Sequence, residues 1–147
     1  MSKGVQQMLN ALAFMGLEMK EIVALIRLGK AKVTKQKLAE QGFVAYTEKQ
    51  VLGRGKQLGL HYLGVNEGEG PTPLGISFLP KCMLAIFVND EDVDQAVRVI
   101  QDANKTGDIG DGKIFVCRAE DVVRIRTDER GDAPLSRTAE VSTSASV

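Results

Sequence analysis

The 147-residue sequence has no tryptophan and a single histidine, His61, so an imidazole could serve as a general base at one position at most. It is also poor in cysteine. Cys82 and Cys117 each lie within an apolar run, which predicts two buried thiols in a reducing compartment rather than a disulfide or a metal site. These absences argue against histidine- or cysteine-based catalysis.

The sequence also lacks an excess of either charge and any long apolar run. Its 19 basic and 19 acidic residues balance, so no overall attraction to nucleic acid or to a membrane surface is expected. No apolar segment approaches the roughly 20 residues that span a bilayer. Residues 5–16 follow a single lysine, Lys3, and no convincing signal-peptide cleavage site follows them. We therefore expect a cytoplasmic protein, and the chain length predicts one domain with its own core.

Six segments carry the pattern of a strand or a helix. Alternating or continuous apolar residues indicate strands, and apolar residues that recur about every 3.6 positions indicate helices. In chain order, the predicted elements are strand 20–28, helix 31–41, strand 43–52, strand 82–88, helix 90–103 and strand 113–117. Residues 1–18 are predicted to be a peripheral leader, residues 19–135 the domain, and residues 136–147 a disordered tail, because the end of the chain turns to Ser, Thr and Ala.

Residues at the helix ends support these boundaries. Gly42 stands where a glycine commonly closes a helix, and Asn89 is predicted to cap the second helix, with three acidic residues in its first turn. The first helix carries several lysines, for which a solvated face is favoured over a nucleic-acid patch. These lysines are Lys30, Lys32, Lys35 and Lys37.

The order of the elements is that of the split βαβ, ferredoxin-like plan. This is an α+β fold in which two helices cover one face of an antiparallel sheet of four strands. The first and third strands are nevertheless apolar on both faces. The face without helices therefore needs a partner, and we expect an oligomer.

The segment 106–116, TGDIGDGKIFV, is the motif on which the functional argument depends. Gly107, Gly110 and Gly112 precede Lys113, and such a turn can direct backbone N–H groups and a mobile positive charge at phosphate oxygens. The spacing fits the start of the phosphate-loop pattern G-x-x-x-x-G-K. However, Ile114 replaces the Ser or Thr that binds magnesium, and the loop follows a helix rather than a strand. A plain helix-to-strand turn is the alternative.

Two further segments, residues 53–78 and 121–127, are candidates for a functional role. Residues 53–78 are rich in glycine and have no regular pattern, which indicates either a functional loop or a misassigned element. They open with a second cluster of glycines and bases, GRGKQLG, at 53–59. Residues 121–127 predict an extended segment, in which alternation places Arg124 and Arg126 on the same side.

Together these motifs resemble the PII signal-transduction family, the trimeric sensors of nitrogen and energy status, over residues 19–135. TGDIGDGKIFV stands in the place of the family's nucleotide-loop signature, and RIRT at 124–127 resembles its C-terminal arginine motif. GRGKQ at 53–57 and LPK at 79–81 resemble the two ends of the family's T-loop, at about residues 54–80. The resemblance implies a trimer of ferredoxin-like subunits that is not an enzyme.

The resemblance implies that ATP or ADP binds in a cleft between neighbouring subunits, where Arg124 and Arg126 reach in from the neighbour. Magnesium would be held by the ATP phosphates and Gln57. 2-Oxoglutarate would bind only with MgATP, because a dicarboxylate beside a triphosphate is repelled unless a metal and cations bridge them. The implied nucleotide-binding residues are Thr47, Gly53, Gly55, Lys56, Gln57, Phe87, Gly110, Asp111, Gly112, Lys113, Arg124 and Arg126. Those implied for 2-oxoglutarate are Arg27, Gln57, Gly59, Lys81 and Gly110. Without the resemblance, Lys81 is simply a lysine at a strand start that points into solvent.

Three departures from the family pattern point to one of its branches. The T-loop is longer than usual, and its only tyrosine, Tyr62, lacks the family's surrounding motif, so control by uridylylation is not expected. Lys56 stands where arginine is usual, which keeps the charge but loses the fork. Ala85 stands where many members carry a glutamate in the nucleotide cleft. These features resemble the NifI branch, which switches off nitrogenase when nitrogen is plentiful and whose members act in pairs. The implied assembly is a homotrimer or a mixed oligomer with a paralogous subunit, and the implied target is a nitrogenase component.

Other functions stay open. A classical PII regulator of an ammonium transporter or of glutamine synthetase control would share the sites, although the loop tip at 67–71 offers no arginine for a membrane channel. A sensor of bicarbonate or another metabolite is possible because the loop sequence sets the effector. An enzyme is disfavoured, since His61 lies in the long loop and no base stands beside the glycines.

Overall fold

The structure is a computed structural model that describes residues 2–5, 7, 18–55, 78–131 and 133–135. Its strands are β1 (Met19–Arg27), β2 (Thr47–Gly53), β3 (Leu79–Asn89) and β4 (Lys113–Ala119). The helices that cover the sheet are α2 (Ala31–Glu40) and α3 (Val93–Asn104), and short 3-10 turns lie at Leu28–Lys30, Asp90–Asp92 and Ala133–Leu135. The predicted order of strands and helices is confirmed.

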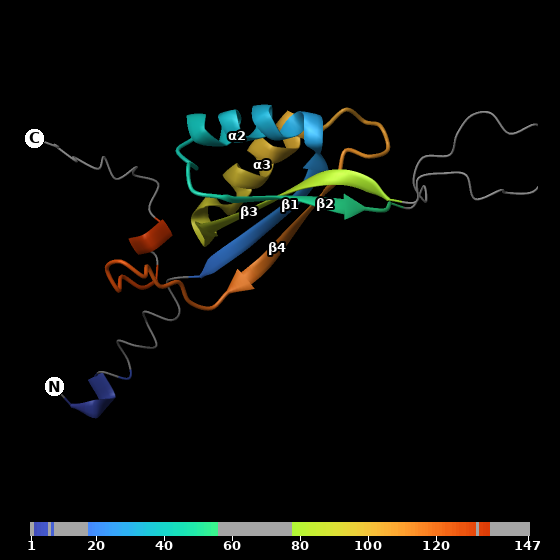
Figure 1. The fold of residues 1–147 in the computed structure, drawn as a ribbon. Coiled ribbons are helices and arrows are strands. Elements are labelled where there is room, and N and C mark those ends of the chain that lie inside the picture. The colour runs from blue at the N-terminus through green and yellow to red at the C-terminus, as the bar shows by residue number, and fades with distance from the viewer. Residues whose placement is uncertain (1, 6, 8–17, 56–77, 132, 136–147) are drawn as a thin grey trace, which may run out of the picture.

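The four strands form one antiparallel sheet in the order β2-β3-β1-β4, and Figure 1 shows both helices on the same face of this sheet. This is the predicted ferredoxin-like α+β arrangement. The core lies between sheet and helices, where alternate residues of β1 and β3 meet the apolar sides of α2 and α3. Its most enclosed side chains include Ile22, Ile26, Leu38, Leu84 and Ile100.

The strand register brings three basic residues to one end of the sheet. Arg27, the last residue of β1, pairs with Lys81 of β3, and Leu25 pairs with Lys113 of β4. Because side chains alternate along a strand and paired residues share a face, Arg27, Lys81 and Lys113 all belong to the face opposite the helices. Three cations are therefore placed together by backbone pairing alone.

The end of α2 is closed by Gly42, as predicted. Gly42 has a φ of +84°, and its N–H donates to the carbonyl of Ala39 at 2.9 Å. The N–H of Phe43 donates to the carbonyl of Leu38, also at 2.9 Å. This pair of bonds is a Schellman motif, and its usual apolar contact is available because Phe43 and Leu38 are both buried.

The predicted cap at Asn89 is wrong. Its side chain makes no capping hydrogen bond, and α3 begins only after the 3-10 turn Asp90–Asp92. The amide of Asp90 instead donates to the carbonyl of Glu18 at 2.8 Å. The entry to this helix is therefore fixed by the chain that leads into β1 and not by a side-chain cap.

Several predicted details differ from the structure. The second strand begins at Thr47 rather than residue 43, because the Schellman bonds tie Phe43 back to α2. The third strand already begins at Leu79, within the predicted T-loop. Cys82 is buried as expected, but Cys117 is exposed, because it belongs to the edge strand β4 and to the face without helices.

The face of the sheet without helices is apolar at its centre. Phe87 and Phe115 are 43% and 47% exposed on it, and Val23, Leu25 and Met83 are partly exposed on the same face. A monomeric protein rarely leaves such a continuous apolar surface open to water. This surface supports the expectation of an oligomer.

Some expectations fall on residues that are not described. Most of the predicted leader, residues 56–77 of the predicted T-loop and the predicted tail lie outside the described residues, so these expectations stay predictions. Within the described ranges, no helix is long and apolar enough to cross a membrane.

Replacing Leu38 by alanine should lower the free energy of unfolding by about 2–5 kcal/mol, because this fully buried side chain would leave a cavity between α2 and the sheet. Val33→Ala on the same helix is the matched control. Val33 is 36% exposed, so its loss should cost less than about 1 kcal/mol. Urea unfolding at one fixed protein concentration measures both values, and equal costs would contradict this account of the core.

Candidate functional site

The glycine loop, defined here as residues 106–112, connects α3 to β4 at the end of the sheet where the three basic residues meet. Gly107, Gly110 and Gly112 have φ values of +90°, +102° and +108°, which are costly for residues with a side chain. Gly112 is constrained further, because a Cβ there would overlap the carbonyl oxygen of Leu25 in β1. The loop can approach the sheet this closely only with glycine at position 112.

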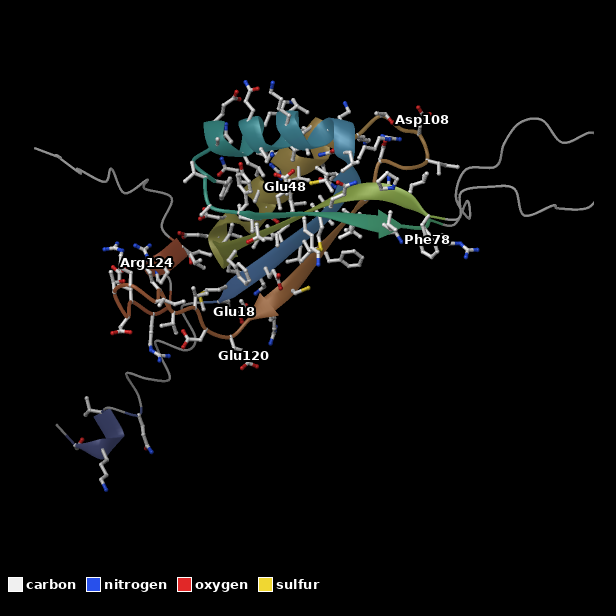
Figure 2. The ribbon with its side chains drawn as sticks, viewed as in Figure 1. Glu18, Glu48, Phe78, Asp108, Glu120 and Arg124 are labelled. Atoms are coloured by element: carbon white, nitrogen blue, oxygen red, sulfur yellow. The ribbon has the colours of Figure 1, made fainter. Side chains whose placement is uncertain are left out.

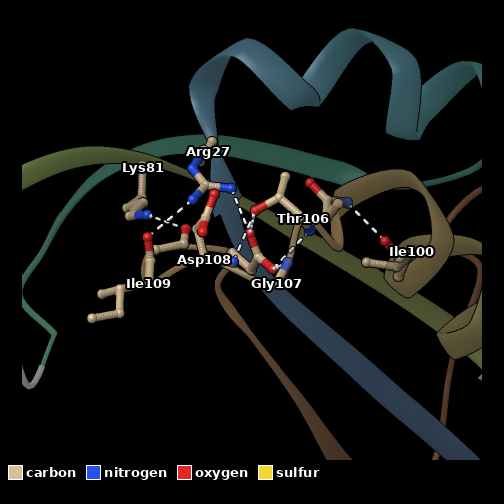
Figure 3. A network of polar contacts seen from close by, with 10 residues as sticks. Arg27, Lys81, Ile100, Thr106, Gly107, Asp108 and Ile109 are labelled. Carbon is tan, nitrogen blue, oxygen red and sulfur yellow. Dashed lines mark hydrogen bonds and ion pairs between the residues drawn. The ribbon is translucent and has the colours of Figure 1, made fainter.

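The carboxylate of Asp111 holds the loop together from inside (Figure 3). Its Oδ2 accepts hydrogen bonds from the amides of Thr106 at 2.8 Å and Gly107 at 2.9 Å. Its Oδ1 accepts one from the Thr106 hydroxyl at 2.5 Å and an ion-pair bond from Arg27 Nη1 at 2.6 Å. The two ends of the loop are thereby joined, and Arg27 ties the loop to β1.

Two cations of the sheet also hold the outside of the loop. Arg27 Nη2 donates to the carbonyl of Ile109 at 3.0 Å, and Lys81 Nζ donates to the carbonyl of Gly110 at 2.8 Å, as Figure 3 shows. In a trans peptide the C=O and N–H groups point in opposite directions. The N–H groups of Gly110 and Asp111 are therefore turned away from Arg27 and Lys81.

The loop leaves donors available for an anion. Within the described part of the chain, the amides of Gly110, Asp111 and Gly112 make no hydrogen bond to another residue. Lys113 follows directly and is exposed. Consecutive free N–H groups beside a lysine form an anion-binding concavity, so the arrangement suits phosphate or carboxylate oxygens.

The electrostatics of the site follow from these contacts. The hydroxyl and amide of Thr106, and then Arg27, hold the pKa of Asp111 well below its usual range, so this carboxylate is ionised at every physiological pH. Burial lowers the pKa of Lys81, and the neighbouring Arg27 guanidinium adds to this effect. An anion bound between Lys81 and Arg27 would relieve both costs.

The structure unites part of the predicted 2-oxoglutarate and nucleotide sites. Arg27, Lys81, Gly110 and Asp111 are in direct contact, and Gly112 and Lys113 continue the same loop. Gly53 is also adjacent, since a Cβ there would lie 3.1 Å from Cγ of Lys81. Lys81 does not simply point into solvent from a strand start, because its amine is engaged with the loop.

Thr47 and Phe87 lie elsewhere, in a groove of about 280 Å³ between β3 and the chain that leads into β2. Pro134 also lines this groove, and Ala85, the partner of Thr47 across the two strands, brings no charge into it. Gly55 is exposed and lies just beyond the end of β2. Lys56, Gln57 and Gly59 lie outside the described residues.

Arg124 and Arg126 do not reach the glycine loop within one chain. Figure 2 places Arg124 at the end of the molecule opposite Asp108 of the loop, beyond the far end of β4. The predicted extended conformation is also wrong. Both arginines lie in a turn closed by a hydrogen bond of 2.9 Å from the Asp128 amide to the Arg124 carbonyl, and Asp128 has a φ of +57°. Only a second copy could bring these arginines to the loop.

Sequence reasoning missed Thr106 and the carbonyl of Ile109. The available signal was a Thr-Gly pair four and five residues before an aspartate, a spacing at which a short acidic side chain can accept backbone N–H bonds. The carbonyl contact had no signal in the sequence, since it depends on the register that places Arg27 beside the loop.

The fold and the site define a ferredoxin-like domain with an anion-binding loop at one end of its sheet. The family model "Nitrogen regulatory protein P-II" matches residues 19–129, and the chain belongs to this family. Its members are regulatory proteins by that description.

Individual relatives agree with the NifI branch. A nitrogen fixation nifHD region glnB-like protein 2 of Methanococcus maripaludis is 46% identical over 121 residues, which cover 80% of this chain and 100% of the relative. A similarly named protein of Methanosarcina barkeri is 43% identical over 122 residues, covering 80% and 99%. A nitrogen regulatory protein P-II 2 of Methanothermobacter thermautotrophicus is 47% identical over 113 residues, covering 77% and 94%.

A solved structure is similar as well. The PII of Arabidopsis thaliana bound to citrate superimposes with a TM-score of 0.63 at 27% sequence identity. The match covers 82% of this chain and 94% of the plant chain, so the likeness extends over nearly the whole domain.

Gly112→Ala should disrupt the loop far more than Gly107→Ala, although both positions have positive φ. Gly107 has open space where a Cβ would stand, so its replacement should cost about 1–2 kcal/mol of backbone strain. At Gly112 the overlap with Leu25 adds about 1–3 kcal/mol of overpacking. Thermal unfolding and amide exchange of the loop measure the difference, and equal effects of the two variants would contradict the close approach.

Proposed function

We propose that this protein is a non-enzymatic cytoplasmic regulator that binds ATP or ADP at the glycine loop and, with MgATP, 2-oxoglutarate beside it. The observation that carries the proposal is the set of free amides at 110–112 next to Lys113, at the end of the sheet where Arg27 and Lys81 meet. Membership in a family of nitrogen regulatory proteins supports it.

The nucleotide phosphates would occupy the glycine loop, and the base would extend towards the groove that Thr47 and Phe87 line. The donor set fits this ligand, because backbone N–H groups and a lysine bind phosphate oxygens without the need for a preceding strand. Gly53, Gly55, Lys56 and Gln57 would close the site from the base of the T-loop.

2-Oxoglutarate would bind where the two inner cations lie. Lys81 would pair with one carboxylate of the acid, Arg27 would lie nearby, and Gly59 and Gly110 would contribute backbone groups. Magnesium, held by the phosphates and Gln57, would neutralise the repulsion between the acid and the triphosphate. The citrate bound to the plant PII is consistent with a carboxylate ligand in this family.

The proposed assembly is a trimer, either of this chain alone or mixed with a paralogous subunit. Its subunits would cover one another's apolar faces, on which Phe87 and Phe115 are exposed. Each subunit would also deliver Arg124 and Arg126 to the glycine loop of its neighbour, which agrees with the position of Arg124 at the opposite end of the subunit from Asp108.

The proposed target is a component of nitrogenase, controlled through the T-loop. The names of the nifHD-region relatives favour this target over an ammonium transporter, glutamine synthetase control or a bicarbonate sensor. Bound ligands would set the T-loop equilibrium by their differential affinity for its two states.

Lys113→Gln should weaken ATP and ADP binding roughly 10- to 100-fold, because a charge-assisted hydrogen bond is worth about 1.5–3 kcal/mol. Lys32→Gln, which removes the same charge from an exposed position on α2, is the matched control and should change nothing. Calorimetric titration measures both affinities. Absence of nucleotide binding by the unaltered protein would refute the proposal.

Mixing two defective chains tests whether the site is shared. In one chain, Arg124→Gln and Arg126→Gln together should leave the nucleotide site of a neighbouring subunit incomplete. In the other chain, Lys113→Gln should disable the nucleotide site of the same subunit. Mixed oligomers should recover a fraction of intact sites if arginines cross between copies. No recovery after confirmed subunit exchange would show that each site is built within one chain.

Capture from an extract of nitrogen-fixing cells tests the target. The immobilised protein with MgATP should retain a nitrogenase component and release it when 2-oxoglutarate is added. Lys81→Gln should retain the same component but require more 2-oxoglutarate for its release. Capture of a membrane transporter instead would replace nitrogenase as the target.

A further inference from the structure

The carboxylate of Asp111 has no acceptor site left for a ligand. A carboxylate offers about four lone-pair sites. Here they are filled by the amides of Thr106 and Gly107, the Thr106 hydroxyl and Arg27. All four donors belong to this chain, so Asp111 faces its own loop and not the space in front of the amides at 110–112.

These bonds divide the amides of the loop into two groups. Those of Thr106 and Gly107 are occupied by Asp111, and that of Asp108 donates to the Thr106 hydroxyl oxygen at 3.2 Å. Those of Gly110, Asp111 and Gly112 stay available. Closing the first part of the loop on Asp111 therefore fixes the position of the second part.

A second support comes from outside, through carbonyl groups. Arg27 and Lys81 hold the carbonyls of Ile109 and Gly110 and thereby turn the following N–H groups outward. These carbonyl oxygens accept hydrogen bonds from the two cations, in the way that the oxygens of a carboxylate ligand would. A dicarboxylate that binds Lys81 competes with the carbonyl of Gly110 for the ammonium group, and displacement of this carbonyl removes part of the outer support of the loop.

We propose that Asp111 is a positioning residue of the glycine loop, which keeps the amides at 110–112 in place when a dicarboxylate takes Lys81 from the Gly110 carbonyl. Its side chain does not touch the nucleotide. This inference rests on the proposed function, because it concerns the second anion at the same site. It predicts that the affinity for 2-oxoglutarate depends on Asp111 more strongly than the affinity for ATP alone does.

The unequal dependence has a physical reason. We call the four bonds that the Asp111 carboxylate accepts from Thr106, Gly107 and Arg27 the brace. With ATP alone bound, Arg27 and Lys81 can still hold the loop carbonyls, so the loss of the brace is partly compensated. With the acid bound, Lys81 is withdrawn, and the loop is held only by the brace and by the bond from Arg27 to the Ile109 carbonyl. In Asp111→Asn, the amide side chain loses two acceptor sites and presents N–H groups to donors, so the brace fails.

The test compares Asp111→Asn with Asp108→Asn. Asp108 is exposed in the same loop, so its replacement removes the same charge without touching the brace. Calorimetry would measure ATP binding first and then 2-oxoglutarate binding to MgATP-saturated protein. Asp111→Asn should weaken the binding of ATP about threefold and the binding of 2-oxoglutarate tenfold or more, whereas Asp108→Asn should change neither affinity.

A milder variant guards against misfolding. Thr106→Val keeps the backbone amide but removes the hydroxyl that donates to Asp111 Oδ1. It should also weaken 2-oxoglutarate binding, but by a smaller factor. The double variant of Thr106→Val and Asp111→Asn should bind the acid no more weakly than Asp111→Asn alone, because both changes act through one carboxylate.

The outcomes separate this inference from the proposed function. Equal losses for ATP and the acid, or an Asp111→Asn variant that matches Asp108→Asn, would overturn the positioning role while leaving the nucleotide site intact. If the unaltered protein binds no ATP, the proposed function fails. Hydrogen exchange at the amides of Thr106 and Gly107, which donate to Asp111, then decides alone: faster exchange in Asp111→Asn than in Asp108→Asn supports the brace, and unchanged exchange overturns it.

Discussion

The antiparallel register of β1 with its two neighbours is the constraint on which the site depends. It places Arg27 opposite Lys81 and Leu25 opposite Lys113, and it leaves the Leu25 carbonyl where only a glycine can pass. A shift of β1 by one residue would send the side chain of Arg27 to the helix-covered face, away from Lys81 and Lys113. The buried alternation of Ile22, Ala24 and Ile26 prevents such a shift, so the core of the domain sets the geometry of its charges.

The site is built from opposing charges in a fixed order. Arg27 neutralises Asp111, Asp111 organises the start of the loop, and the carbonyls of Ile109 and Gly110 each accept one hydrogen bond, from Arg27 and Lys81 respectively. Arg27, Lys81 and Asp111 each have a partner before any ligand arrives. At the two cations, binding of the proposed ligand would therefore be an exchange of partners, which limits the cost of holding two cations near each other.

The sequence predicted the fold well because its strongest patterns are local. The alternation in β1, the apolar run in β3 and Gly42 after α2 each indicate one element without reference to the others. The failures arose where backbone hydrogen bonds, which leave no apolar pattern in the sequence, decide the local conformation. The Asn89 cap was displaced by a bond to Glu18, the start of β2 by the Schellman closure, and the extended arginine segment by a turn at Asp128. Within the site, the sequence indicated the loop and Lys81, but the inward direction of Asp111 required the structure.

The sheet order has a consequence for the life of the isolated subunit. Both outer strands, β2 and β4, pair on one side only within the described part of the chain, so each presents a row of unpaired backbone groups. Beside them lies the apolar surface with Phe115. Open strand edges next to exposed aromatic rings are a template for aggregation. The proposed assembly would cover this aromatic surface, so association would protect the subunit during and after synthesis.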